Sequence, residues 1–453
     1  MLVKSLKQTG QINMREGYTM DYDNQVNSNN GTNYSSEVFN GFSTSMGLTA
    51  TFFKNNMYFF YRGRSTDDLL GAKSNNGVNW SAVPINSASN TDGTPECVVF
   101  KGKIYVFFQG TSSHRIYYTS SSDGSSWSTD IGLDAETGEG HAKNWDLQGA
   151  MSTLVFNDKL YLYYPASNSG GTIYKNLNVA WTSDGSTWNY NTIYTSNALD
   201  YNDYIRKVNV ERFNNSIFYF VADGTGTTRY YISSSPTSFS NTTPYSLTAI
   251  NDGVKGYSVP RTMIYNGRMY IYYVDDSQLL RFTYTTNGIN WNQSYTQINA
   301  GSGHQIDVLA IPTKTLNAQN VTAQSTYPYS GYSPWNIIDG DITTTVGGQF
   351  SWTNGDIYSI DGKLPQWVEI DFGSTVTFGR LNFYTSDNYE IRDYEVHYNL
   401  NGTWYPLLNI TNNTYSFKRH DFIVRNARYL RIICKNGPSI QPQYARLNEI
   451  EIY

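Results

Sequence analysis

Short apolar runs alternate with polar turns along most of the chain, and one kind of turn returns at regular intervals. It contains Asp-Gly or Asn-Gly, with an aromatic residue at a fixed distance after it. Four clear copies and a fifth degenerate one lie at 72–80 (AKSNNGVNW), 117–127 (YYTSSSDGSSW), 180–188 (AWTSDGSTW), 283–291 (TYTTNGINW) and 232–239 (ISSSPTSF). Asp, Asn and Gly tolerate the positive φ that tight hairpins require. The pattern therefore predicts β-hairpins, each with a Trp or Phe that packs beneath its own turn.

A second pattern lies upstream of each turn and keeps step with it. It reads as an apolar strand, a short polar turn and an aromatic-rich strand, and its copies begin at Phe52, Val99, Val155, Arg212 and Ile264. Together the two patterns form a four-stranded meander that repeats about every fifty residues. One such sheet cannot bury both of its faces, and radial packing of several copies solves this problem. The repeats predict five blades of a β-propeller, at 46–85, 94–135, 149–195, 204–247 and 257–300.

The segments that flank the repeats leave the number of blades open. Residues 304–312 (HQIDVLAIP) read as one more inner strand, which closes the ring or begins a partial sixth blade. We therefore expect five blades, with six as the alternative. Residues 1–45 are polar with little strand pattern, so we expect them to wrap the propeller or anchor it to other subunits of a particle. The propeller is expected to span 46–313 and a linker to span 314–320.

Composition agrees with an all-β fold and excludes some functions. Aromatic residues make up 16% of the 453 residues and include 40 Tyr, whereas charged residues make up only 15%. Aromatic residues favour strands, and no segment has an apolar stripe of helical period. The net charge is −5 and no Lys/Arg run occurs, which argues against nucleic-acid binding. No apolar run approaches the roughly 18 residues that span a bilayer, so we expect no membrane insertion.

From residue 321 onward the strands continue but the repeated turn is lost. The landmarks of this part are SPWNIIDGDITTTVGG from Ser333, LPQWVEIDFG from Leu364, FIVRNARYLRII from Phe422 and LNEIEIY from Leu447. This series resembles the discoidin domain, also called the coagulation factor type C (F5/8 type C) domain, which is related to a bacterial carbohydrate-binding module. The resemblance covers 321–453 and implies a jelly-roll β-sandwich with a ligand site in the loops at one end. The propeller turns resemble, more loosely, those of five-bladed furanosidase-type glycoside hydrolases and lectin-like propellers.

The predicted sandwich loops contain residues suited to carbohydrate binding. Aromatic rings stack on the C–H face of a sugar, while Arg and Asn side chains hydrogen bond to its hydroxyl groups. The candidates are Trp352, Asn354, Asn388, Tyr389 and Arg392.

The resemblance also implies a structural calcium ion near the Asp-Gly loop. The loop offers Asp339, Asp341 and Thr344, and Glu449 lies on the last predicted strand. Several hard oxygen donors in a tight turn suit calcium. The alternative is an Asx-turn that holds no metal.

The propeller offers carboxylates for a hydrolytic alternative. Glycosidic cleavage needs one carboxyl group to protonate the leaving oxygen and another to activate water or form an ester. Candidates near the starts of inner strands are Asp92, Glu96, Asp146 and Glu211. The first blade begins FSTSMGLTATFF and lacks the acidic residue that the furanosidase resemblance implies, which argues against catalysis.

Three functions therefore stay open at the level of sequence. The preferred one is an adhesin-like, lectin-like protein that recognises a cell-surface glycan or polysaccharide, extracellularly or at a surface. The N-terminus has no apolar core typical of a signal peptide, which favours a virion component, such as a phage protein for host attachment. The alternatives are a glycoside hydrolase with an appended carbohydrate-binding domain and a structural component of a larger assembly.

Overall fold

The computed structural model describes most of the chain, which divides into two compact units. The described residues are 12–17, 23–28, 35–39, 44–53, 56–63, 66–75, 79–85, 89–111, 115–133, 151–167, 174–195, 207–214, 216–222, 228–239, 245–246, 260–265, 268–274, 279–292, 296–302, 305–310, 318–356, 358 and 362–452. The larger unit consists of Gln11–Ile264 and Arg268–Ala310, and the smaller is built mainly on Ile311–Tyr453. The described residues form β-strands and one short 3-10 helix, so the fold is all-β as predicted. No helix among them has the length and apolar character needed to cross a bilayer.

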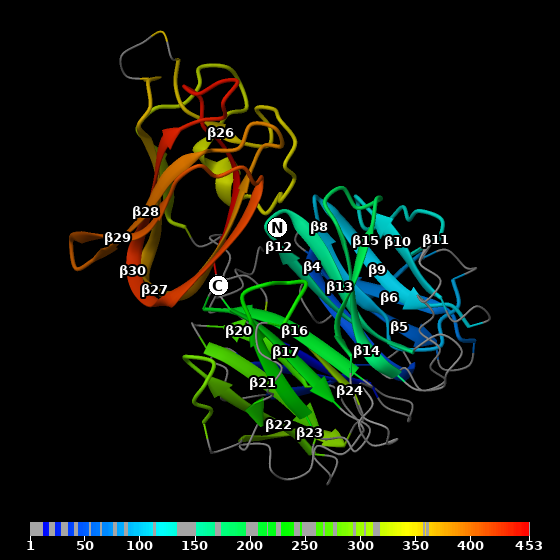
Figure 1. The fold of residues 1–453 in the computed structure, drawn as a ribbon. Helices are drawn as coiled ribbons and strands as arrows, with labels where there is room; N and C mark the ends of the chain where they lie inside the picture. Colours follow the sequence, from blue (N-terminus) through cyan, green and yellow to red (C-terminus); the bar gives the residue numbers. More distant parts are fainter. Residues whose placement is uncertain are drawn as a thin grey trace. The chain divides into compact units, whose positions relative to one another are not determined.

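Five antiparallel sheets of four consecutive strands form the blades that the repeats predict, and Figure 1 shows them in chain order from blue to green. Their strands are β4 (Thr44–Phe53), β5 (Asn56–Gly63), β6 (Leu69–Ser74) and β7 (Ser81–Val83); β8 (Glu96–Phe100), β9 (Lys103–Gln109), β10 (Ile116–Ser121) and β11 (Ile131–Gly132); β12 (Ser152–Phe156), β13 (Lys159–Ser167), β14 (Tyr174–Thr182) and β15 (Asn189–Thr195); β16 (Lys207–Phe213), β17 (Ser216–Ala222), β18 (Thr228–Ser233) and β19 (Tyr245–Ser246); and β20 (Arg261–Tyr265), β21 (Arg268–Val274), β22 (Leu279–Thr285) and β23 (Thr296–Ser302). First strands of successive blades lie in contact, β4 with β8, β8 with β12, and β12 with β16.

A further four-stranded sheet joins the two ends of the propeller unit. β24 (Gln305–Ala310) pairs antiparallel with β1 (Ile12–Gly17), and β2 (Asp23–Ser28) and β3 (Ser35–Phe39) complete the sheet. β24 contacts both β4 and β21, so this sheet lies between the first and fifth blades. The inner strand predicted at 304–312 is thus present and contributes to ring closure. β1, β2 and β3 form although residues 1–45 carry little strand pattern, because backbone pairing with β24 does not require an apolar sequence.

The side chain of the Asp or Asn that precedes Gly stabilises three of the repeated turns. Oδ1 of Asp123 accepts the backbone N–H groups of Ser125 and Ser126, each at 2.7 Å. These bonds stabilise the ionised carboxylate and hold the pKa of Asp123 well below its usual range. Asp184 and Asn287 accept the equivalent pairs of N–H groups in the third and fifth blades. The side chains therefore serve the turn itself, as expected.

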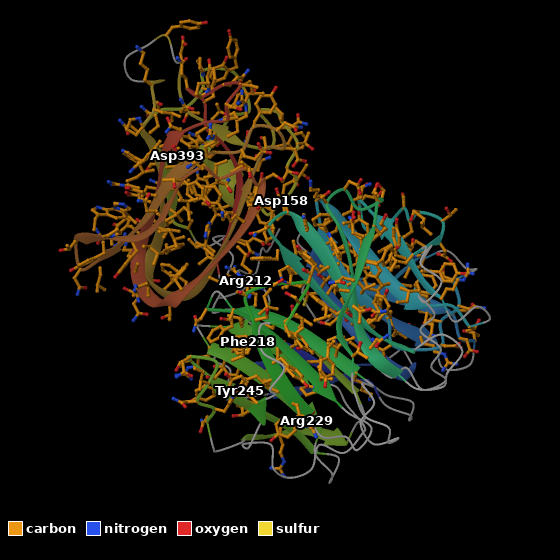
Figure 2. The ribbon with its side chains drawn as sticks, in the orientation of Figure 1. Asp158, Arg212, Phe218, Arg229, Tyr245 and Asp393 are labelled. Atoms are coloured by element: carbon orange, nitrogen blue, oxygen red, sulfur yellow. The ribbon has the colours of Figure 1, made fainter. Side chains whose placement is uncertain are left out.

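Three described turn glycines, Gly124, Gly185 and Gly288, each lie against an aromatic ring of the preceding blade. A Cβ atom at Gly185 would lie 2.0 Å from the hydroxyl oxygen of Tyr105, and one at Gly288 would lie 2.3 Å from Phe218, which Figure 2 labels on β17. Both glycines also have positive φ, +79° and +78°. These turns thus require Gly for two reasons, the backbone conformation and the close approach to the neighbouring blade.

The Trp after three of these turns reaches the same neighbouring blade, whereas Trp80 packs edge-on against Phe59 of its own blade, with ring centroids 4.9 Å apart. The three indole rings pack edge-on against a Phe two residues beyond the turn's aromatic partner, in the pairs Trp127–Phe60 at 5.3 Å, Trp188–Phe107 at 5.7 Å and Trp291–Phe220 at 6.2 Å between centroids. These rings are half-buried packing residues, as predicted. The predicted location beneath their own hairpins was wrong for these three rings, because the indole packs against the preceding blade, whereas Trp80 and Phe239 contact rings of their own blades. Turn and Trp together fasten one blade to the next.

The second unit is a jelly-roll sandwich made from one continuous seven-stranded sheet. The sheet order is β26-β31-β27-β30-β28-β29, and β25 pairs with β27. The elements are β25 (Asn320–Ala323), η4 (Pro334–Ile338), β26 (Trp352–Thr353), β27 (Gln366–Thr385), β28 (Asp393–Leu400), β29 (Thr403–Ile410), β30 (Phe417–Asn436) and β31 (Arg446–Ile452). Register shifts in the pairing of β27 with β30 let these two 20-residue strands bend, and Figure 1 shows both as long curved ribbons. Each long strand therefore serves both layers.

The core of this unit lies between the two layers. Phe383 and Tyr394 stack at its centre with ring centroids 4.3 Å apart, and Trp352, Ile337 and Leu447 are fully buried around it. Cys434 is buried in the same core, and Cys97 is buried in the propeller; both are free thiols. With its interior filled by apolar side chains, the sandwich leaves its connecting loops as the place for polar chemistry.

Candidate functional site

Several loops of the sandwich bring tyrosine side chains together at one end of it. Tyr327 follows β25, and its ring centroid lies 5.2 Å from Tyr329, 5.2 Å from Tyr332 and 5.7 Å from Tyr444. Tyr444 belongs to the loop between β30 and β31, so two loops far apart in sequence share these contacts. The backbone N–H of Tyr327 donates to the carbonyl oxygen of Thr353 on β26 at 2.9 Å, which ties the first loop to the sheet.

An arginine at the start of β31 lies among these rings. The guanidinium carbon of Arg446 lies 4.6 Å from the ring centroid of Tyr389 and 5.4 Å from that of Tyr444. Its Nη2 donates to Oε1 of Gln441 at 2.6 Å. Its Nη1 is buried and has no hydrogen-bond partner among the described residues. We call Tyr327, Tyr329, Tyr332, Tyr389, Tyr444 and Arg446 the tyrosine–arginine cluster.

Burial changes the electrostatics of the cluster, while its edge remains open to solvent. Burial lowers the pKa of Arg446, and burial together with the neighbouring Tyr327 raises the pKa of Tyr444. Tyr329 is 69% exposed, and Tyr358, whose hydroxyl contributes to the raised pKa of Tyr444, is 89% exposed. The arrangement combines solvent-facing aromatic rings with a partly desolvated guanidinium donor. Such a surface can stack on an apolar ring face and donate hydrogen bonds to its polar substituents.

A comparison with protein families matches residues 320–449 to the F5/8 type C domain. This part of the chain is an F5/8 type C domain. No curated protein sequence matches the chain.

Part of the chain is similar to three solved carbohydrate-binding modules. A CBM32 module of Clostridium perfringens, in complex with GalNAc-β-1,3-galactose, is 19% identical, with 31% of this chain and 97% of that chain covered and a TM-score of 0.26. The family 32 module of NanJ from the same organism, in complex with galactose, is 20% identical, covering 29% and 91%, with a TM-score of 0.25. Chitosan-binding module 1 of the chitosanase/glucanase from Paenibacillus sp. IK-5 is 22% identical, covering 31% and 98%, with a TM-score of 0.24.

Three of the predicted sugar-binding residues lie in one loop of the F5/8 type C domain. Tyr389 contacts Arg446 and so belongs to the tyrosine–arginine cluster. Asn388 is exposed beside it with φ at +64°, and its backbone N–H donates to Glu390 Oε1 at 2.9 Å. Arg392 is half-buried, and its Nη2 donates to Asn412 Oδ1 at 3.1 Å. Of these three residues, Tyr389 is the one whose ring contacts Arg446 of the cluster.

The predictions for Trp352 and Asn354 were wrong. Both side chains are fully buried, with 0% exposure, so neither can touch a sugar. Trp352 fills the domain core and donates its indole N–H to the carbonyl of Ser325 at 3.1 Å. Asn354 Oδ1 accepts the N–H of Ala445 at 2.7 Å, and its Nδ2 donates to the carbonyl of Gln443 at 3.0 Å. Asn354 therefore positions the loop that carries Tyr444, and sits beneath the site rather than in it.

The sequence analysis missed most of the tyrosine–arginine cluster. Tyr327, Tyr329 and Tyr332 stand in the segment YPYSGY, and Tyr444 and Arg446 stand in QYAR just before the last strand. The available signal was the gathering of Tyr in predicted loops, where no strand requires them. A chain with 40 Tyr hides this signal, because most of its tyrosines serve the blades.

The residues predicted to bind calcium do not all converge in the F5/8 type C domain. Asp341 Oδ1 accepts the N–H of Thr343 at 3.0 Å, and Thr344 donates its hydroxyl to Asp387 Oδ2 at 2.7 Å. Asp339 and Glu449 do meet, and their carboxyl groups hydrogen bond to each other. Burial is the main reason why the pKa of Asp339 is raised. Two touching carboxyl groups must share a proton or a cation. Asp341 and Thr344 do not extend the pair, and the described residues contain no group of three or more His, Cys, Asp or Glu side chains that could hold a metal ion.

The carboxylates proposed for hydrolysis have other roles where the structure describes them. Glu96 Oε2 lies 3.3 Å from Nη1 of Arg261, and its Oε1 accepts both the N–H and the hydroxyl of Thr153, each at 3.0 Å. Glu211 Oε1 accepts the N–H of the next residue, Arg212, at 2.9 Å. Asp92 is half-buried, and Asp146 lies outside the described residues. Glu96 is thus part of a buried ion pair that links β8, β12 and β20.

Proposed function

We propose that this protein binds glycans through the tyrosine–arginine cluster of its F5/8 type C domain. The observation that carries the proposal is the combination of solvent-facing rings with a buried guanidinium donor on loops at one end of the sandwich. Tyr329 and Tyr358 offer open ring faces, and Arg446 offers Nη1, which has no protein partner among the described residues. Sugars present an apolar C–H face beside hydroxyl groups, and this set of side chains matches both.

The proposal extends to an adhesin-like role, in which glycan binding attaches the protein to a cell surface. A virion component that mediates host attachment is the specific form we favour, with the protein acting extracellularly or at a surface. Several copies on one particle would raise the avidity of a modest single site. If this role is right, soluble full-length protein in excess competes with particle attachment, and a cluster variant does not.

Loss of an exposed tyrosine is expected to weaken glycan binding without disturbing the fold. Tyr329→Ala and Tyr358→Ala each remove a solvent-facing ring, and a stacking contact is worth about 0.5–1.5 kcal/mol, which corresponds to a decrease of up to about tenfold in affinity. Titration calorimetry with a glycan first identified on an array, using the full chain, measures the change. The matched control is Tyr405→Ala, because Tyr405 is 41% exposed but packs on Tyr398 of the β28–β29 hairpin.

If the wild type and the Tyr329→Ala, Tyr358→Ala and Tyr405→Ala variants bind the glycan with equal affinity, the cluster is not the glycan site. The same incubation is also assayed for reducing ends, because a binding protein leaves the glycan intact while a hydrolase releases sugar. Accumulation of reducing ends that depends on Glu96 would replace the binding proposal by the hydrolytic one.

We also propose that a calcium ion stabilises the F5/8 type C domain at Asp339 and Glu449. Because the pKa of Asp339 is raised, the uncomplexed pair stabilises the fold at acidic pH, and this contribution is lost as pH rises through the raised pKa. A bound cation would keep both groups ionised at neutral pH. Millimolar calcium is therefore expected to raise the Tm of the wild type by roughly 2–4 °C at pH 7. The Tm of the Asp339→Asn variant should not change with calcium. If calcium leaves the Tm of the wild type unchanged as well, the proposal is wrong.

A further inference from the structure

Arg446 differs from two other stacked arginines of its domain, Arg431 and Arg428, in what balances its charge. Arg431 lies 4.7 Å from the ring centroid of Trp367 and 4.2 Å from that of Trp404, and it donates to Glu369 Oε2 through two nitrogens at 2.9 and 2.7 Å. Arg428 lies over Tyr429 and likewise donates to both carboxylate oxygens of Asp371, at 2.8 and 3.0 Å. Each of these guanidinium groups rests on aromatic rings and has a carboxylate at its edge.

Arg446 has the rings but a neutral partner at its edge. Its Nη2 donates to the amide oxygen of Gln441, and its buried Nη1 donates to no group among the described residues. Burial lowers the pKa of Arg446, and the other groups that act on it are the hydroxyls of Tyr332, Tyr389, Tyr444 and Tyr327, which are uncharged at neutral pH. The carboxylate of Asp356 contributes to the raised pKa of Tyr444, and its Oδ1 accepts the N–H of Tyr358 at 2.9 Å.

A cation in this position is energetically unfavourable on its own. Removing a charge from water is costly unless a group of opposite charge and a full set of hydrogen bonds offset the loss. A guanidinium group stays charged at neutral pH even when burial lowers its pKa. A hydroxyl group of a neutral sugar would satisfy the hydrogen bond of Nη1 but leave the charge uncompensated. An anionic ligand would satisfy both, through a charge-assisted bond that is about twice as strong as a neutral one.

We propose that the tyrosine–arginine cluster binds an anionic sugar, whose carboxylate or sulfate ester accepts a hydrogen bond from Nη1 of Arg446. The inference rests on the proposed function and narrows its ligand class. The exposed rings of Tyr329 and Tyr358 stack on the sugar, and Arg446 selects its charge. The protein supplies the cation of an ion pair, and the glycan supplies the anion.

The test compares each anionic sugar with its own neutral form on the full chain. Oligogalacturonate, oligoglucuronate and oligomannuronate are titrated beside their methyl esters, which remove the charge and keep the sugar. Sulfated galactose oligosaccharides are titrated beside the unsulfated ones. At least one anionic form is expected to bind tenfold or more tightly than its neutral partner. Raising the salt concentration should reduce this difference, and the identity of the preferred anion distinguishes a carboxylate ligand from a sulfate ester.

Variants separate charge selection from folding. Arg446→Gln is expected to bind the acid and its ester equally, Arg446→Lys to retain part of the preference, and Arg428→Gln to behave as the wild type because Arg428 lies on the sheet face and is paired to Asp371. If Arg446→Gln unfolds, the salt dependence of the wild type and the Arg446→Lys titration decide the matter. Neutral glycans that bind as tightly as anionic ones would overturn the inference and leave the proposed function standing. Failure of every glycan on a broad array to bind would overturn the proposed function itself.

Discussion

Gly185→Ala should destabilise the propeller by roughly 3 kcal/mol, the sum of two separate penalties. A non-glycine residue at positive φ costs about 1–2 kcal/mol, and forcing extra atoms into a packed site costs about 1–3 kcal/mol. Gly185 has φ at +79°, and its new Cβ would lie 2.0 Å from the hydroxyl oxygen of Tyr105. The Tyr105 ring cannot retreat easily, because it is 4% exposed and packs against Phe107 and Tyr118. Urea unfolding of the full chain measures the loss.

Gly102→Ala is a matched control within the second blade. Gly102 has a similar φ of +71°, but a Cβ there would meet nothing within 4 Å. This variant should therefore show the backbone penalty alone, about 1–2 kcal/mol. The difference between the two variants isolates the contact between blades.

Removing the clashing atom should restore part of the lost stability. In the Gly185→Ala background, Tyr105→Phe deletes the hydroxyl group, and the nearest remaining ring atom would lie 2.9 Å from the Cβ. The double variant is expected to be more stable than Gly185→Ala alone, although Tyr105→Phe removes a hydroxyl group. If Gly185→Ala and Gly102→Ala lose the same stability, the contact of Gly185 with Tyr105 does not hold the two blades together. The turn would then require Gly185 only for its positive φ.

The propeller was predictable because its information is local. An Asp-Gly or Asn-Gly pair sets a hairpin within a few residues, and repetition multiplies that evidence. The contact of Gly185 with Tyr105 was not predictable in this way, since it joins residues of different blades. The strands of residues 12–39 were missed for a related reason. They are defined by pairing with β24, almost the whole propeller away in sequence, and their own residues carry no apolar alternation.

The glycan site shows the same division between local and distant information. The sequence predicted the sandwich and its loops, and Tyr389 was among the predicted sugar-binding residues. Trp352 was misassigned because a loop-like sequence position does not reveal that the ring points inward, where it is fully buried. Arg446 was overlooked because nothing in QYAR indicates that two other loops, those of Tyr327 and Tyr389, lie beside it. Burial and unpaired donors are properties of the folded arrangement.

Glu96→Ala is the second variant from which we expect a large loss of stability. The side chains of Glu96 and Arg261 are 10% and 6% exposed, and their charges lie 3.3 Å apart on β8 and β20. Removing one partner of a buried ion pair costs about 3–5 kcal/mol, because the other charge remains buried. The variant also deprives the N–H and hydroxyl of Thr153 of their common acceptor. A surface pair gives the contrast: Asp67→Asn, which removes the partner of Arg62, should cost under about 1 kcal/mol.

The double variant Glu96→Leu/Arg261→Met distinguishes a stabilising ion pair from one that merely avoids a penalty. Because two buried charges also carry a desolvation cost, their joint replacement by apolar side chains is expected to be far less harmful than Glu96→Ala, within about 1–2 kcal/mol of the wild type. A double-mutant cycle in urea, completed by the single variants Glu96→Leu and Arg261→Met, measures the coupling directly. If the losses simply add, the two side chains do not act as a pair across the propeller, and Glu96 must be held for another purpose. Retention of a carboxylate there would then be a reason to assay the chain for sugar release with Glu96→Gln, which keeps an acceptor for Thr153 and removes only the charge.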